Sequence, residues 1–210
     1  MGETVEPGAR AVAVRRGLRL EAITVGWMAI EAALALGAGI AARSVLLTAF
    51  GADSVVELLS GWVLLWRLRA ESGAGGAGSV AAVERRATRV SAVLLVLLCV
   101  YVGLTSVAGL ALRVEPERSW IGVAVSGAAV LLMPWLAVRK RSANRVIQSP
   151  ALRADIAESV TCAYLAAVTL VGTGLDALTG WWWVEYVAAV ALLRWLIPEA
   201  REAIDAARGD

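Results

Sequence analysis

Four side chains that can bind a metal ion lie inside segments that are otherwise apolar enough to be buried in lipid. Asp53 and Glu57 are four residues apart in one segment, and Glu158 and Cys162 are four residues apart in another. Residues at this spacing lie on adjacent turns of one face of a helix. A carboxylate at the centre of a bilayer is costly, so such residues usually face a partner or an ion path. The pattern predicts an ion site inside a membrane.

The composition is that of an integral membrane protein. Of the 210 residues, 59% are hydrophobic, and the mean hydropathy is +0.70, which is too apolar for a soluble domain. Apolar runs of roughly 20 residues are long enough to cross the hydrocarbon core as helices. We therefore expect an all-α membrane protein with six transmembrane helices. The predicted spans cover about residues 18–42, 45–66, 90–112, 120–138, 151–175 and 181–196.

The polar residues between these runs predict the domain organisation. A transporter domain over residues 18–198, with a flexible linker at about 67–88, lies between a segment at 1–17 and a short tail at 199–210. The basic residues Arg139, Lys140 and Arg141 are expected to close the fourth helix. The first apolar run is too long for a signal-peptide core, so we expect it to remain in the protein.

The distribution of basic residues predicts the orientation. Basic residues in short loops are retained on the cytoplasmic side of a membrane. With both termini cytoplasmic, 17 of the 20 Lys and Arg residues lie on that side. We therefore expect a multi-pass protein of the plasma (inner) membrane with both termini in the cytoplasm. We expect no nucleic-acid partner.

The four candidate ligands suit a divalent cation. Placed face to face, Asp53, Glu57, Glu158 and Cys162 offer three oxygen donors and one thiolate, which is the number that a tetrahedral ion needs. Carboxylates suit harder ions, whereas a cysteine shifts the preference toward zinc, cadmium, cobalt or ferrous iron. The chain has no histidine, which weighs against assigning zinc. We expect zinc, iron, manganese, cobalt or cadmium as the substrate, and no bound cofactor.

The crowding of these acids also predicts a coupling mechanism. Close, partly desolvated carboxylates cannot all be ionised, so some hold protons when no metal is bound. A divalent ion must displace those protons when it binds. A site that opens alternately to the two sides of the membrane would then exchange metal for protons, which is cation/proton antiport.

Two further acids are possible accessory residues of the site. Asp155 is three residues before Glu158, and it can act as a ligand or form an ion pair at the cytoplasmic end of its helix. Glu31 can line an access cavity, relay a proton, or bond to a neighbouring helix. Cys99 is expected to be a small buried hydrophobic residue. We expect four further acids to be solvated at the outer face, namely Glu115, Glu117, Asp176 and Glu185.

Residues 44–61 (SVLLTAFGADSVVELLSG) and 151–172 (ALRADIAESVTCAYLAAVTLVG) carry a family likeness. The chain resembles the cation diffusion facilitator family, also called cation efflux proteins, along essentially all six spans. The resemblance implies a transport site built from a [His/Asp]xxxAsp pair in the second helix and another in the fifth. Asp53 and Glu57 match the first pair with one change, and Glu158 and Cys162 replace both residues of the second.

The resemblance also implies a homodimer and a cytosolic domain after the sixth helix. The last residues of this chain are too few to form that domain, so the likeness indicates a membrane-domain-only member that dimerises through its helices. The alternative is a non-transporting membrane metal sensor or accessory subunit. An intramembrane metallo-enzyme is disfavoured because four protein ligands close a site and no separate general base is evident. We therefore expect that the chain is not an enzyme.

Overall fold

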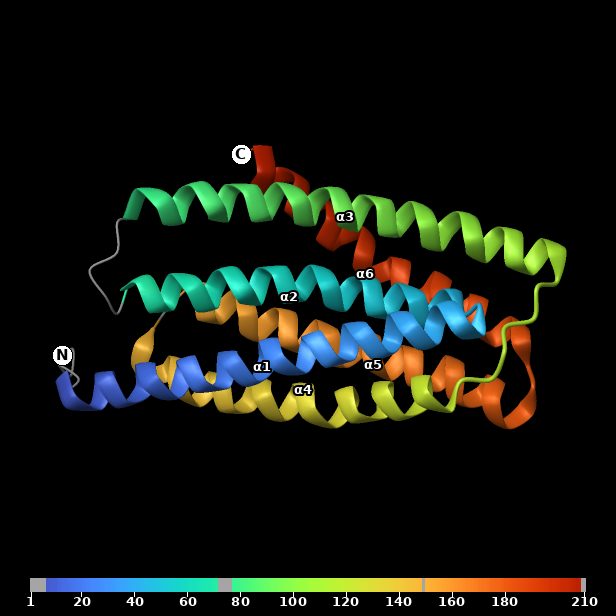
Figure 1. The fold of residues 1–210 in the computed structure, drawn as a ribbon, viewed down its shortest axis with the longest axis horizontal. Coiled ribbons are helices and arrows are strands. Elements are labelled where there is room, and N and C mark those ends of the chain that lie inside the picture. The colour runs from blue at the N-terminus through green and yellow to red at the C-terminus, as the bar shows by residue number, and fades with distance from the viewer. Residues whose placement is uncertain (1–6, 72–76, 149, 209–210) are drawn as a thin grey trace.

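The computed structural model describes residues 7–71, 77–148 and 150–208, which form helices and turns without any strand. The described residues form six long helices, and Figure 1 shows that successive helices run in opposite directions. Five of them, α1 to α5, are long and apolar enough to cross a membrane. The all-α fold class is confirmed, and the five apolar helices are compatible with a multi-pass membrane protein. The helices are α1 (Pro7–Ala42), α2 (Val45–Glu71), α3 (Ala77–Leu112), α4 (Trp120–Ile147), α5 (Pro150–Thr179) and α6 (Trp182–Arg208).

The prediction of a flexible polar linker at about 67–88 is wrong for most of that range. Helix α2 continues to Glu71 and α3 already begins at Ala77, while residues 72–76 lie outside the described residues. The polar ends of both helices contain alanine, arginine and glutamate, which are good helix formers.

The basic run at Arg139 to Arg141 does not close α4. The helix continues through Pro134 and through the basic run to Ile147. It ends at Gln148, whose backbone is left-handed with a φ of 56° and whose N–H donates to the Asn144 carbonyl at 2.8 Å. Lys140 is fully buried. It therefore lies on the packed face of α4, and not in a loop after the helix.

Helix α6 differs from the predicted sixth span at residues 181–196. It continues past Pro198 to Arg208, so most of the predicted tail is helical. Glu185 and Arg194 interrupt its apolar sequence, and α6 is not among the helices whose length and composition suit a membrane span. It packs against α3, α5 and α2.

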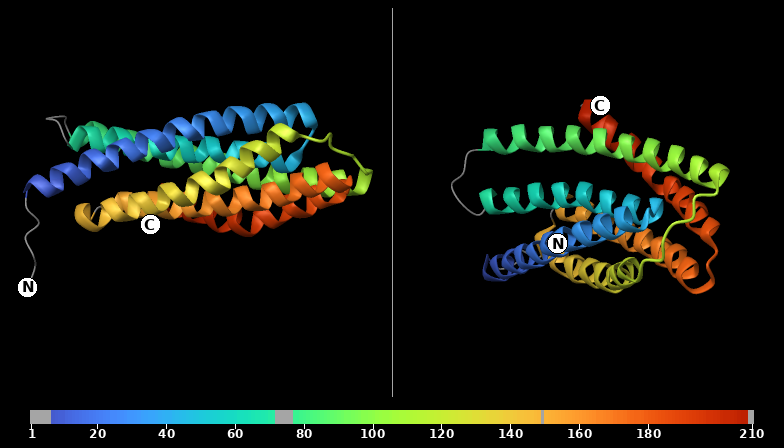
Figure 2. Two further views of the ribbon diagram at one scale, coloured as in Figure 1. Left: turned by 90° about the horizontal axis from the view of Figure 1, so that it is seen from below. Right: turned by 45° about the vertical axis from the view of Figure 1, so that its right-hand side comes forward.

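Helix α2 is the central element of the bundle. It contacts α1, α3, α5 and α6, and Figure 2 shows α3 on one side of it and α1, α4 and α5 on the other. A tight turn joins it to α1, in which Arg43 has a φ of 54°. The Ser44 hydroxyl then accepts the Leu47 N–H at 3.0 Å, as a residue preceding a helix commonly does. The polar side chains in the middle of α2 therefore lie among several helices.

The close approach of α1 and α2 gives a testable expectation. A Cβ atom at Gly51 would lie 2.6 Å from the Leu36 backbone nitrogen, so Gly51→Ala should push the two helices apart. We expect a loss of about 1–3 kcal/mol in the free energy of unfolding, measured by thermal unfolding in detergent. Gly37→Ala is the control, because nothing lies within 4 Å of a Cβ there. Equal unfolding temperatures for both variants would contradict the packing.

Candidate metal centre

The two α2 acids are buried in the middle of the bundle. Asp53 and Glu57 are each only 3% exposed. One Asp53 oxygen (Oδ1) and both Glu57 carboxylate oxygens have no hydrogen-bond partner. A buried carboxylate without hydrogen bonds is unfavourable unless it binds a proton or a cation. The pair is therefore suited to binding a cation or protons.

Glu31 links three helices through hydrogen bonds. Its carboxylate accepts a bond from Trp27 Nε1 at 2.5 Å on α1 and from Ser54 Oγ at 2.7 Å on α2. The Cys162 thiol of α5 lies 3.7 Å from the same carboxylate. Glu31 therefore bonds to neighbouring helices, which was one of its expected roles. It does not line the acidic cavity described below. Cys162 is also close enough to interact electrostatically with Glu57.

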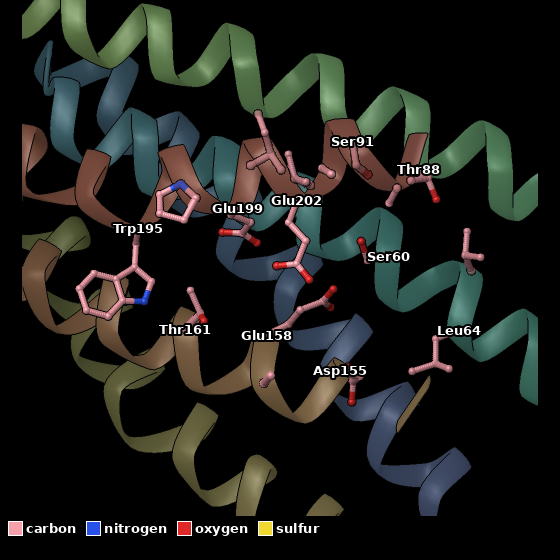
Figure 3. A pocket seen from close by; sticks show the side chains of 17 residues that line it. Ser60, Leu64, Thr88, Ser91, Asp155, Glu158, Thr161, Trp195, Glu199 and Glu202 are labelled. Carbon is pink, nitrogen blue, oxygen red and sulfur yellow. The ribbon is translucent and has the colours of Figure 1, made fainter. Parts of the chain in front are cut away.

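An acidic cavity of about 550 Å³ lies between α2, α3, α5 and α6. In Figure 3, Glu158 of α5 and Glu199 and Glu202 of α6 extend into the same space. The cavity is lined by the C-terminal halves of α2 and α6 and the N-terminal halves of α3 and α5, so it lies toward the end of the bundle from which both termini emerge. Val56, which precedes Glu57, also lines it. The cavity thus reaches the turn of α2 that carries Glu57, although neither Asp53 nor Glu57 lines it.

A buried ion triad lies beside this cavity. The Lys140 ammonium of α4 is 2.9 Å from a Glu21 carboxylate oxygen of α1 and 2.6 Å from an Asp155 oxygen of α5. Lys140 and Glu21 are completely buried. Asp155 thus forms an ion pair, which was one of its two expected roles. It also lines the cavity.

The four predicted ligands lie in one region of the bundle, but they do not converge on a single metal position. Asp53 interacts electrostatically with Glu158, Glu199 and Glu31, which places α5 and α6 acids around the α2 pair. Within the described parts of the chain, no three His, Cys, Asp or Glu side chains are positioned to hold a metal ion together. The ligand set therefore stays a prediction, and the observed arrangement is a cluster of acids from several helices.

Comparison with models of known protein families and with curated proteins finds no match. The chemistry of the site therefore follows from its own residues. Carboxylates outnumber basic side chains around the α2 pair. The nearby Lys140 is already paired with two acids, Glu21 and Asp155. Such an arrangement attracts cations or protons and repels anions.

Two of the acids that we expected to be solvated at the outer face are buried, so that expectation is wrong for them. Asp176 is 4% exposed and Glu185 is 2% exposed. The Glu185 carboxylate lies close to the Ser44 side chain and to the backbone at Val45 and Leu46, at the start of α2. A carboxylate stabilises a helix N-terminus because the free N–H groups there carry partial positive charge. Glu115 and Glu117 are exposed as expected, and Cys99 is only half-buried.

Three functional candidates were missed from the sequence, namely Glu21, Lys140 and Glu199. Their helical spacing carries the signal that could have identified them. Lys140 follows buried Leu136 by four residues and precedes buried Ala143 by three, so it falls on the apolar stripe of α4. Glu199 similarly follows buried Leu196 by three residues. A charged residue on a buried stripe is unfavourable unless it is paired or binds a ligand.

Proposed function

We propose that this chain is a divalent metal cation transporter that works by proton-coupled efflux. The observation that carries the proposal is the α2 pair, Asp53 and Glu57, whose carboxylates are buried and largely without hydrogen bonds. The acidic cavity beside them supports it, since a transported ion needs both a desolvated site and a path to it. The sequence resemblance to cation efflux proteins agrees with this function.

The acids around the site supply the coupling to protons. Several carboxylates this close cannot all be charged in a dry environment, so without metal some carry protons. A cation that enters through the cavity is attracted by Glu158 and Glu199 at its wall and displaces protons from the α2 pair. Opening of the same site to the opposite side would release the metal and admit protons. One site that alternates between the two sides is sufficient for antiport.

The topology belongs to the same proposal. The excess of Lys and Arg in the loops on the side of the termini supports a cytoplasmic location for both ends. The acidic cavity would then open toward the cytoplasm, as export requires. We further propose that α6 forms the sixth span, that the chain lies in the plasma (inner) membrane, and that it works as a homodimer. The transported ion is one of zinc, iron, manganese, cobalt and cadmium.

Metal flux in proteoliposomes tests the function. We expect an imposed pH gradient to drive uptake of at least one of these metals, and a protonophore to abolish the uptake because it collapses the gradient. The reverse experiment, in which a metal gradient drives proton movement, should give the matching signal. Glu115→Gln removes an exposed loop acid and should leave the flux unchanged.

Tight metal binding without flux of any metal would contradict transport. That result would instead favour the membrane metal sensor or accessory subunit. Flux that is insensitive to the pH gradient would retain transport and reject the proton coupling.

A further inference from the structure

Glu199 of α6 is a half-buried acid that has one carboxylate oxygen without a partner. It follows Pro198 within the helix, and its side chain points into the acidic cavity, as Figure 3 shows. One of its carboxylate oxygens, Oε2, is buried without a hydrogen-bond partner. An oxygen in this state needs a proton or a cation to offset its lost hydration.

Glu199 is also connected to the α2 pair. Its charge interacts with Asp53, Glu57 and Glu158, so α6 adds an acid to the cluster that α2 and α5 form. Asp53 and Glu57 are more than nine-tenths buried and hold unpaired oxygens. These free oxygens are a separate indication that a positive ligand belongs among the four acids.

Cys162 is almost completely buried, at 1% exposed. Its thiol lies 3.7 Å from Glu31 on α1 and is also close to Glu57, and, like the α2 pair, it does not line the cavity. It is packed in an apolar cluster with Met28, Met133 and Leu136. Apolar burial disfavours the thiolate, which is the form of cysteine that binds metals.

We infer that Glu199 replaces Cys162 as the fourth ligand, so that the cation is held by Asp53, Glu57, Glu158 and Glu199 through oxygen atoms alone. This inference rests on the proposed function, since it names the substrate class of the same site. An all-carboxylate set favours hard divalent ions such as Mn²⁺ over soft ions such as Cd²⁺. The four side chains must move together to hold the ion, because no three of the described candidates are in ligand positions now.

Cobalt spectroscopy tests the ligand set on the unaltered protein in detergent. Co²⁺ bound by a thiolate gives a sulfur-to-metal charge-transfer band, whereas Co²⁺ bound by carboxylates does not. We expect bound Co²⁺ without this band. A charge-transfer band that disappears in Cys162→Ser would overturn the inference, and this measurement does not require any Glu199 variant to fold.

Equilibrium binding of Mn²⁺ to purified variants provides the second test. Glu199→Gln should weaken Mn²⁺ binding at least about ten-fold, as the loss of a group that supports a metal commonly does. Glu202→Gln is the matched control, because Glu202 lines the same cavity but is exposed, and it should change the affinity less than about two-fold. Cys162→Ser should also leave Mn²⁺ binding unchanged.

Unchanged Mn²⁺ affinity in Glu199→Gln would show that Glu199 is not a ligand. These measurements concern binding alone, so they are separate from the flux assays that test transport. Oxygen-only binding without flux would reject the proposed function and retain the ligand set. Gradient-driven flux together with a thiolate charge-transfer band would retain the proposed function and reject the ligand set.

Discussion

Lys140→Met should destabilise the protein more than any other single substitution considered. The change leaves Glu21 and Asp155 buried with no cation, although each now lies within 2.9 Å of the Lys140 ammonium. Removal of one partner from a buried ion pair costs about 3–5 kcal/mol, because the remaining charge stays buried without compensation. Thermal unfolding in detergent should show a midpoint lower by on the order of 10 °C.

Two companion variants make this result specific. Arg141→Met removes a neighbouring but exposed charge and should have little effect. The triple variant Glu21→Gln, Lys140→Met, Asp155→Asn removes all three charges together and should recover much of the lost stability, since no unpaired charge remains. If Lys140→Met unfolded at the temperature of the unaltered protein, the triad would not be an energetically important contact.

Asp53→Asn and Glu57→Gln should each reduce gradient-driven metal flux to the level of liposomes without protein. Each variant removes a charged ligand and a proton carrier but keeps the size of the side chain. Both should also unfold at the same or a higher temperature, because a neutral amide is less costly to bury than an unpaired carboxylate. Flux and unfolding, measured on the same preparations, would therefore change in opposite directions.

The matched control for these variants is Asp176→Asn. Asp176 is another buried acid, but it lies near the opposite end of α5 from the cavity. We expect it to retain flux. Normal flux in Asp53→Asn, or equal loss in Asp176→Asn, would exclude a special role for the α2 pair.

The apolar segments could be predicted from the sequence because hydropathy is a local property. The second span was predicted at about 45–66, and the membrane-compatible part of α2 is Val45–Trp66. The burial of Asp53 and Glu57 followed in the same way from their place in an apolar run. Gly51 carries a similar local signal, because a small residue lets the backbone of a neighbouring helix come close.

The partners of the charged residues could not be predicted from local sequence. Lys140 was assigned to a loop because two arginines flank it, whereas its environment is set by Glu21 and Asp155 on two other helices. Glu199 was placed outside the last span because the apolar run ends at about Leu196. Glu185 was expected to be solvated because it is close to a turn, but it contacts the start of α2. Each error arose where a contact between distant segments determines the environment.

The buried triad also has a consequence for the biogenesis of the chain. Glu21 is synthesised with the first helix, but its only described counter-ion, Lys140, arrives with the fourth. Until then the carboxylate lacks this cation and should remain at the headgroup level or protonated. The first helix can therefore reach its final depth only after the fourth has been inserted. A nascent chain that stops before α4 would therefore retain an acid in its first span without its Lys140 partner.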